Sequence, residues 1–273
     1  MKSIGIIGSG QMGAGIAQVA AQAEFSVFLY DVADAALQKG LRTIETSLAK
    51  LAQKGKITEE QKKQTLSRLQ ATSKMDDFKK CDLVIEAVPE KLSLKQEIFQ
   101  KLDSIVKKEA ILATNTSSIS ITQVAAATQR PDKVLGLHFM NPVPLMPLVE
   151  VIRGNATSDT TYTGGLAFIQ RLGKTPITAK DHPGFVINRI LCPMLNEAAY
   201  ALHEGLATKE DIDLGMKLGC NFPMGPLTLA DFVGLDTLVA ILEIMKKTPC
   251  PLLKKMVAEG KLGRKNGEGF YKY

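Results

Sequence analysis

Short apolar runs alternate with amphipathic segments over the first 153 residues of the chain. A run that is almost wholly apolar is typical of a strand that is buried on both faces of a sheet. Such runs predict strands at 3–8, 25–31, 82–87, 110–114, 133–139 and 149–153. Apolar positions at helical spacing predict helices at 11–23, 33–54, 93–105 and 120–128, and the polar segment 57–69 is also expected to be helical.

Strands that alternate with helices predict an α/β domain with a doubly wound, mainly parallel sheet. The pattern changes after about residue 184. From 185 to 248 it is helical, with breaks at Pro193, at Gly205 and at the FPMGP turn of residues 222–226, and it predicts no strand. We therefore place a boundary in the DHPG sequence at 181–184. An α/β domain is expected over 1–183 and an all-helical domain over 184–273.

The composition narrows the class of protein. Of 273 residues, 45% are hydrophobic and 23% are charged, as in ordinary globular proteins. No apolar run approaches the roughly 20 residues that span a bilayer, and the N-terminus does not resemble a signal peptide, so we expect no membrane association. The four cysteines are scattered without a C-x-x-C pair. This predicts reduced thiols in a cytoplasmic protein, and with only three widely spaced histidines we expect no metal site.

The charge balance adds a weaker indication. The formal net charge is +6, but the chain has no Trp and no basic run with interleaved aromatics, so nucleic acid is not an expected partner. A modest positive balance suits an anionic small molecule, although ordinary surface lysines would explain it equally well.

The first predicted turn carries the sequence G-x-G-x-x-G at Gly8, Gly10 and Gly13. A strand precedes it, a helix follows it, and Asp31 ends the next strand 18 residues beyond Gly13. This context predicts a Rossmann-type dinucleotide site, with the pyrophosphate on the helix N-terminus and the acid on a ribose hydroxyl. An acid there favours NAD over NADP, although Asp31 could also be a simple strand-end acid. Gln11 and Met12, within the motif, are expected to line the same site.

Hydride transfer from a secondary alcohol would require a base for the hydroxyl proton, and imidazole is suited to this task. Three histidines are candidates. His203 lies within a predicted helix and His182 in the DHPG linker, where a turn residue is the simpler interpretation. His138 ends an apolar strand, VLGLHF, at the carboxyl edge where ligands bind in parallel sheets.

Glu150 lies in the next apolar strand, PLVEVI, where a buried carboxylate requires a partner. It could pair with any base. Beside His138 it would fix the imidazole tautomer and stabilise the imidazolium, as the carboxylate of a catalytic triad does.

Several longer motifs resemble the short-chain L-3-hydroxyacyl-CoA dehydrogenase family, with the greatest similarity to the bacterial enzymes that act on four-carbon substrates. They cover essentially the whole chain, in order. The motifs are ATNTSSISIT (113–122), GLHFMNPVPLMPLVEVI (136–152), DHPGFVINRI (181–190), MGPLTLADFVGLD (224–236) and GRKNGEGFYKY (263–273). The resemblance implies an NAD-dependent oxidoreductase that interconverts a short (S)-3-hydroxyacyl-CoA and the 3-ketoacyl-CoA.

The resemblance also implies site residues. Its catalytic His–Glu pair maps onto His138 and Glu150, and Ser117 and Asn188 would hydrogen-bond the substrate oxygens, with Ser117 also near the cofactor and the acyl-CoA. Both could instead be local helix caps, with Ser118 and Ser120 as competitors of Ser117. A site residue in the second domain implies a cleft that could close on the substrate. Further positions expected to approach NAD are Glu90, Lys95, Asn115, Asn141 and Lys265.

The acyl-CoA substrate is expected to meet one face of the long helix over 33–54. Ser47, Lys50 and Lys54 are spaced at i, i+3 and i+7, so they share a face. A solvated lysine face is the common explanation of such spacing, but the family places its CoA-contacting serine and lysine at positions that match Ser47 and Lys54.

Two rival functions stay open at this stage. One is a β-hydroxyacid dehydrogenase that acts on a free acid, and the other is a non-catalytic NAD-binding protein on the same fold. The apolar helices of the second domain predict a homodimer. The segment MKKTPCP, between Ile244 and Leu252, is shorter than is usual in the family, which affects local helix ends and part of the subunit contact.

Overall fold

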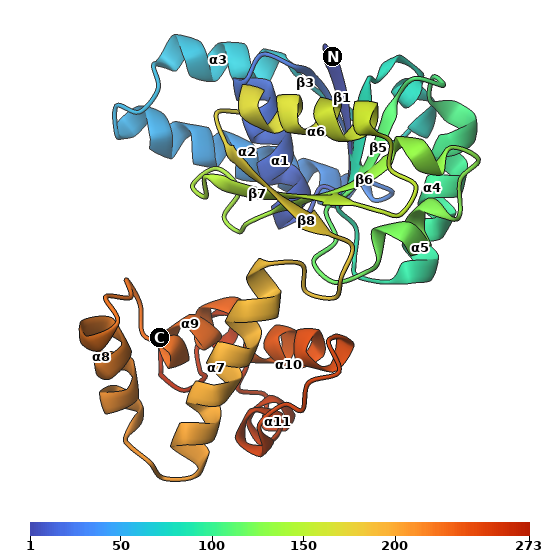
Figure 1. Ribbon diagram of the computed structural model, residues 1–273. Helices are drawn as coiled ribbons and strands as arrows, with labels where there is room; N and C mark the ends of the chain where they lie inside the picture. The colour runs from blue at the N-terminus through green and yellow to red at the C-terminus, as the bar shows by residue number, and fades with distance from the viewer. The chain divides into compact units, whose positions relative to one another are not determined.

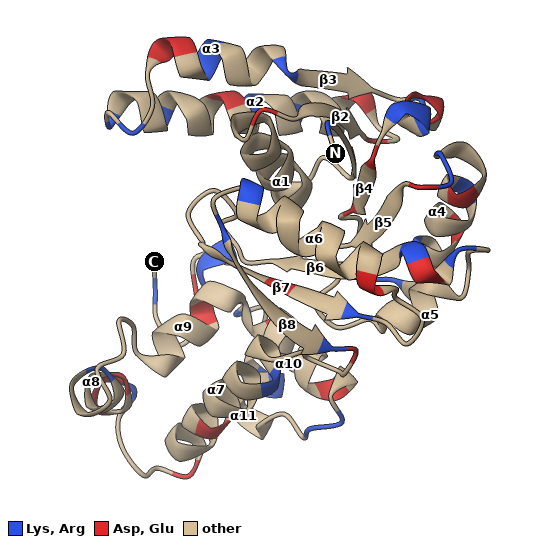
Figure 2. Ribbon diagram, turned by 45° about the horizontal axis from the view of Figure 1, so that its top comes forward, with Lys and Arg blue, Asp and Glu red and all other residues tan.

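The computed structural model describes all residues, 1–273, and they form two compact units, Met1–His182 and Pro183–Tyr273. The division falls one residue before the boundary expected from the sequence. Each unit has its own hydrophobic core. Figure 2 shows basic and acidic residues interspersed along the helices of both units.

The first unit is built on an eight-stranded sheet with the order β3-β2-β1-β4-β5-β6-β7-β8 (Figure 1). All neighbouring strands are parallel except β6 and β7, which are antiparallel. The strands are β1 (Ser3–Ile7), β2 (Ser26–Tyr30), β3 (Leu69–Thr72), β4 (Leu83–Glu86), β5 (Ile111–Thr114), β6 (Val134–Phe139), β7 (Leu148–Arg153) and β8 (Thr175–Lys180).

Helices cover both faces of this sheet, as the doubly wound prediction requires. On β1, Ile4 and Ile6 enter the core formed with α1, α2 and α6, while Gly5 lies against Phe78 on the opposite face. The helices are α1 (Gln11–Gln22), α2 (Asp34–Gln53), α3 (Glu59–Ser67), α4 (Leu92–Ile105), α5 (Ile121–Ala125) and α6 (Asp159–Arg171), with 3-10 turns η1 (Met75–Lys80) and η2 (Pro131–Lys133).

The predicted α/β architecture is confirmed, and each strand predicted from an apolar run is present. The sequence analysis missed β3, α6 and β8. It also did not identify the antiparallel pairing of β6 with β7. A connection of eight residues joins these two strands, which is too short for the crossover that parallel neighbours need.

The second unit is helical, as predicted, and has no strand beyond isolated bridges near the C-terminus. Its core gathers apolar side chains from several helices, among them Leu195, Leu227, Leu238 and Leu253. The helices are α7 (Ile187–His203), α8 (Lys209–Gly219), α9 (Pro226–Val233), α10 (Leu235–Ile244) and α11 (Pro251–Ala258), followed by the 3-10 turn η3 (Arg264–Asn266).

Buried carboxylates hold the second unit together. Asp213 accepts hydrogen bonds from Leu227 N (2.7 Å) and Thr228 N (3.0 Å) and so caps α9. Asp231, which is fully buried, accepts from Phe270 N and Tyr271 N, each at 2.9 Å, and fixes the C-terminal segment. Burial raises the pKa of Asp231. Asp231 thereby joins the segment 224–236 to the segment 263–273.

The short segment between α10 and α11 is fixed by one side chain of α7. Asn196 Nδ2 donates to Thr248 O (3.0 Å), and Cys250 N donates to Asn196 Oδ1 (2.8 Å). The shortened MKKTPCP link is therefore an ordered connection, with its backbone groups paired to a buried amide.

Candidate active site

The glycine turn between β1 and α1 has the geometry of a phosphate cradle. Gly8 adopts a φ of +95°, and a Cβ on Gly13 would lie 1.7 Å from Gly8 O, so both positions require glycine. Around Gly10 a Cβ would meet no atom within 4 Å. The space beside Gly10 is thus open for a ligand to approach the backbone closely.

The N-terminus of α1 completes this cradle. Gly10 is the N-cap, no side chain caps the helix, and its first turn contains no acid. Backbone N–H groups and the helix dipole therefore favour an anion at this end. Gln11, the first residue of α1, donates from Nε2 to Asn141 Oδ1 (2.9 Å), which links the cradle to the loop after β6. These features fit the pyrophosphate of a dinucleotide.

Asp31 lies directly after β2, where a ribose-binding acid belongs. Its Oδ2 accepts hydrogen bonds from Ser9 N and Ser9 Oγ, both at 2.8 Å. Burial works to raise the pKa of Asp31, but the hydrogen bonds from Ser9 and from Ala33 N outweigh it, and the pKa lies below its usual value. The carboxylate is therefore negative at neutral pH, which favours ribose hydroxyls and repels a 2′-phosphate.

His138 and Glu150 form a direct pair. The antiparallel register of β6 and β7 places these residues opposite each other, and His138 Nδ1 lies 2.7 Å from Glu150 Oε2. Glu150 is fully buried and His138 is 8% exposed. Asn115 Oδ1 accepts from Phe139 N (3.0 Å), which fixes the strand beside the imidazole. A carboxylate on Nδ1 sets the imidazole tautomer and stabilises the imidazolium.

Glu90 organises the loop that contains Ser117. Its Oε1 accepts from Ser117 N (2.9 Å), from Ser118 N (3.1 Å) and from the hydroxyl of Thr116. Ser117 Oγ also lies 3.4 Å from this oxygen. The cap of α5 is Ser120, whose Oγ accepts from Gln123 N, so Ser117 is not the cap of this helix.

Behind this loop lies a buried ion cluster. Lys95 Nζ is 2.7 Å from Glu86 Oε1 and 3.3 Å from Glu90 Oε2, and the side chains of Lys95 and Glu86 are at most 1% exposed. Thr114 Oγ1 donates to Glu86 Oε2 (2.7 Å). Burial acts to raise the pKa of Glu90, but the charge of Lys95 and the hydrogen bonds from the serine and threonine hydroxyls hold it below its usual value. Sequence reasoning missed Glu86, although an acid inside the apolar run DLVIEA is a signal of this kind.

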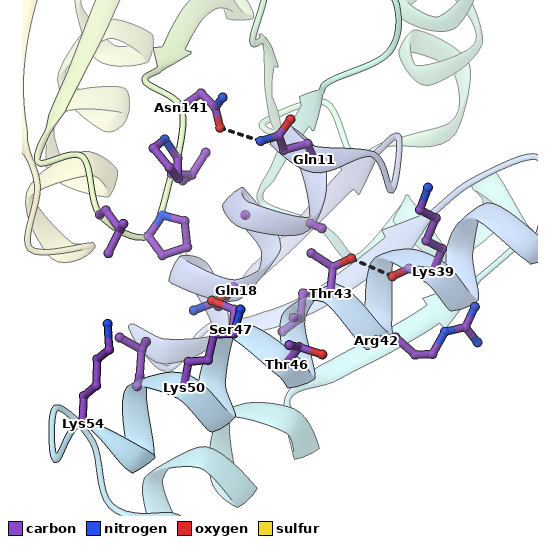
Figure 3. A pocket seen from close by; sticks show the side chains of 18 residues that line it. Gln11, Gln18, Lys39, Arg42, Thr43, Thr46, Ser47, Lys50, Lys54 and Asn141 are labelled. Carbon is purple, nitrogen blue, oxygen red and sulfur yellow. Dashed lines mark hydrogen bonds between the residues drawn. The ribbon is translucent and has the colours of Figure 1, made fainter. Parts of the chain in front are cut away.

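A cavity of about 530 Å³ lies between α1, α2 and the loop after β6. Ser47, Lys50 and Lys54, which were predicted to share a face, all line it. The basic side chains along this cavity come from α2 and from its C-cap, Lys54 (Figure 3). Of these, Lys39 and Arg42 were not predicted. The loop adds an apolar wall, and the lining as a whole consists of Gln11, Ala14, Gly15, Gln18, Lys39, Arg42, Thr43, Ile44, Thr46, Ser47, Lys50, Leu51, Lys54, Asn141, Pro142, Val143, Pro144 and Leu145.

The lining of this cavity contains no Asp or Glu. Cations without acidic neighbours in the wall make a local positive field, which suits a ligand with several phosphates and an apolar arm. Lys50 and Lys54 therefore do more than form a solvated helix face, because their side chains also border this cavity.

Two predicted site residues belong to the second unit. Asn188 lies in the first turn of α7, whose N-cap is Val186, so Asn188 is not the cap of this helix. Lys265, in η3, forms an ion pair with Asp236 at the start of α10. The competing histidines, His182 and His203, are both exposed.

The structure contains neither a metal-binding cluster nor a helix that could span a membrane. No group of three or more His, Cys, Asp and Glu side chains is arranged to hold a metal ion. None of the helices has the length and the apolar character needed to span a bilayer.

Comparison with known proteins gives the family. Residues 3–182 match the NAD-binding domain of 3-hydroxyacyl-CoA dehydrogenase, and residues 184–273 match its C-terminal domain. The chain is 52% identical to a 3-hydroxybutyryl-CoA dehydrogenase of Bradyrhizobium diazoefficiens, with 100% of this chain and 96% of the relative covered. It is 46% identical to the mitochondrial hydroxyacyl-coenzyme A dehydrogenase of Homo sapiens, with 100% and 91% covered.

A solved structure extends this similarity to three dimensions. The crystal structure of (S)-3-hydroxybutyryl-CoA dehydrogenase PaaH1 from Ralstonia eutropha is 51% identical, with a TM-score of 0.96 over 100% of this chain and 99% of that one. Sequence and fold agree along the whole length, and the chain belongs to the 3-hydroxyacyl-CoA dehydrogenase family.

Proposed function

We propose that this protein is an NAD-dependent dehydrogenase that interconverts (S)-3-hydroxybutyryl-CoA and acetoacetyl-CoA. The observation that carries the proposal is the buried His138–Glu150 pair at 2.7 Å, located at the carboxyl end of a strand in a dinucleotide-binding sheet. Relatives that cover the whole chain at about half identity are named for this reaction. NAD supplies a hydride acceptor for C3 of the substrate in one direction and a hydride donor in the other.

His138 moves the proton in this reaction. Its Nδ1 is hydrogen-bonded to Glu150, so proton exchange with the substrate falls to Nε2. In the oxidation, Nε2 takes the proton of the 3-hydroxyl group, and the imidazolium that forms is stabilised by the Glu150 carboxylate. In the reduction, the imidazolium returns this proton to the 3-oxygen as it becomes a hydroxyl.

The glycine turn, the N-terminus of α1 and Asp31 would hold NAD. The open space at Gly10 supports close approach of the pyrophosphate, and the Asp31 carboxylate supports NAD over NADP. Replacing Asp31 by Ala should weaken NADH binding and reduce the preference for NADH over NADPH. An unchanged preference would contradict this role.

Further NAD contacts follow from the family resemblance, at Glu90, Asn115, Asn141 and Lys265. Glu90 is held in place by Lys95, which is 1% exposed. We therefore assign Lys95 an indirect role, in which it fixes the carboxylate that orders the Ser117 loop. Ser117 and Asn188 are proposed to hydrogen-bond the substrate oxygens.

The acyl-CoA is proposed to occupy the cavity along α2. Ser47, Lys50 and Lys54 would contact its phosphates together with Lys39 and Arg42, because lysine and arginine are the residues that pair with phosphate oxygens. The apolar loop wall suits the pantetheine arm.

We also propose a homodimer formed through the second unit. That unit exposes large apolar side chains, with Leu206 at 78%, Leu218 at 76% and Leu214 at 50%. Leu214 and Leu218 share one face of α8. Sedimentation analysis that detects only monomer would contradict a dimer.

The central test compares substrates. Oxidation of NADH is measured with acetoacetyl-CoA and with free acetoacetate, for the wild type and for His138→Gln. Turnover of the thioester alone, lost by orders of magnitude in His138→Gln with NADH binding retained, is the expected result. Turnover of the free acid would favour a β-hydroxyacid dehydrogenase, and no turnover would favour a non-catalytic NAD-binding protein.

A further inference from the structure

The loop between β6 and β7, residues 140–147, has two tasks. It connects the strand of His138 to the strand of Glu150, and its residues 142–145 form the apolar wall of the cavity beside α2. The position of this loop therefore determines how wide that cavity is.

One side of the loop is fixed against α1. Asn141 Oδ1 accepts from Gln11 Nε2 (2.9 Å), and Val143 is 2% exposed. A Cβ on Gly15 would lie 2.8 Å from Val143 Cβ, so the loop approaches the helix as closely as glycine permits. The loop backbone folds back on itself, with Leu145 N and Met146 N each donating to Pro142 O (3.0 Å).

The other side of the loop is held by one ammonium group. Lys174 Nζ donates to Val143 O (2.7 Å) and to Met146 O (2.6 Å), so it bridges two carbonyls across the wall of the cavity. Lys174 itself lies in the tight turn between α6 and β8, where Gly173 has a φ of +71° and Lys174 N donates to Ile169 O. The ammonium group thus reaches the loop from the turn that precedes the edge strand β8.

The surroundings of Lys174 are unusual for a lysine. The residue is half-buried, and both of its recorded ammonium contacts are neutral carbonyl groups. Burial lowers the pKa of this ammonium. Partial burial of a cation without a carboxylate partner is unfavourable unless its hydrogen bonds are strong, and bonds from an ammonium to a carbonyl are about twice as strong as neutral ones. Lys174 thus holds the loop through two strong hydrogen bonds from its ammonium group to backbone carbonyls.

We propose that Lys174 is a positioning residue for the acyl-CoA, which it affects by holding the wall formed by residues 142–145 at the width that the ligand requires. This inference rests on the proposed function of the cavity. Lys174 touches neither the reacting atoms nor the dinucleotide cradle, so its contribution belongs to thioester binding and not to NADH binding or proton transfer.

The test compares Lys174→Met, which keeps the aliphatic stem, with Lys174→Arg, which restores a cation with several donors, and with Lys180→Met. Lys180 is exposed at the C-terminal end of β8, the strand that follows Lys174, and is the matched control. The KM values for acetoacetyl-CoA and for NADH, kcat and the melting temperature are measured for each variant.

For Lys174→Met we expect the KM for acetoacetyl-CoA to rise about tenfold, with the KM for NADH and kcat changed by less than about threefold. Lys174→Arg should recover most of this loss, and Lys180→Met should match the wild type. A purely structural role would lower the melting temperature without separating the two KM values.

An unchanged KM for the thioester in Lys174→Met would overturn the inference, and so would an equal rise in both KM values. If Lys174→Met does not fold, Lys174→Gln carries the same test, because its amide can reach only part of the bridge. Absence of thioester turnover by the wild type would overturn the proposed function instead, so the two failures are distinguishable.

Discussion

Replacing Glu150 by Gln isolates the charge of the carboxylate that supports His138. The change keeps the shape of the side chain and its ability to accept a hydrogen bond at 2.7 Å from His138 Nδ1. Because Glu150 is fully buried on the central part of β7, the substitution removes a negative charge without exposing the site to water. Only the stabilisation of the imidazolium is expected to change.

The magnitude follows from the geometry. Two unit charges about 4 Å apart interact by about 4 kcal/mol at an effective dielectric constant of about 20. The neutral hydrogen bond that Gln retains offsets about 1 kcal/mol of this. The remaining loss of about 3 kcal/mol in the transition state corresponds to a fall in kcat of roughly 150-fold. The KM values for NADH and for the thioester should change little, because neither ligand meets Glu150 directly.

The assay is steady-state oxidation of NADH with acetoacetyl-CoA, together with thermal unfolding of each variant. Asp159→Asn is the matched control, because it makes the same chemical change at a carboxylate that is 89% exposed on α6. A kcat of Glu150→Gln within about tenfold of the wild type would refute the assignment of imidazolium stabilisation to Glu150. A large rise in the KM for NADH would show instead that the substitution distorts the sheet.

The remaining predictions concern the cradle, the thiols and the buried acid cluster. Gly13→Ala should lower the melting temperature by about 10 °C, because its Cβ would overlap Gly8 O. Gly10→Ala should fold normally but bind NADH at least about tenfold more weakly. Equal effects of the two changes on the melting temperature would contradict the cradle geometry. A thiol reagent at pH 8 should modify Cys220 rapidly and the other cysteines only after unfolding, because Cys220 is exposed and the others are buried. Burial raises the pKa of Cys81 to about 11 and that of Cys192 to about 12. A fast reaction that remains in Cys220→Ser would contradict this prediction. The pKa of Glu90 is held below its usual 4.5, so its carboxylate stabilises the fold above that pH, and this contribution is lost as the pH falls through the lowered value. Glu90→Gln should therefore have a lower melting temperature than the wild type at pH 7. A difference in melting temperature that does not narrow towards pH 3 would contradict the assignment.

The fold was predictable where strands lie inside the sheet. The runs that form β1, β4, β5 and β6 are buried on both faces, so their sequences are mainly apolar. The missed strands, β3 and β8, are the two edges of the sheet. Edge strands tolerate polar residues and proline, as in the TPITAK sequence of β8, and so give no apolar run.

Helix α6 was missed for a related reason. Its sequence, DTTYTGGLAFIQR, contains threonines and two adjacent glycines, which are poor helix formers. A Cβ on Gly165 would lie 2.5 Å from a methyl carbon of Leu135 on β6. Close packing on the sheet selects glycine here against helix propensity, and that packing is invisible in the local sequence.

The candidate site divides in the same way. His138 and Glu150 could be identified because a polar side chain in an apolar strand is a local signal. Glu86 carries the same local signal, but its pairing with Lys95 and the place of Lys39 and Arg42 on the cavity could not be predicted, because they depend on which elements meet in space. Likewise, Asp181 of the DHPG sequence accepts from Ile121 N (2.9 Å) and Thr122 N (2.8 Å) at the start of α5, a contact between residues far apart along the chain.

The antiparallel ladder of β6 and β7 determines which changes of chain length this protein can accept. Side chains alternate between the two faces of a strand, so deletion of one residue just before Glu150 within β7 would turn its carboxylate to the opposite face from His138. An insertion between 140 and 147 leaves the ladder in register and alters only the wall of the cavity. Variation in loop length can therefore reshape the cavity proposed for the acyl-CoA while the acid–base pair stays intact.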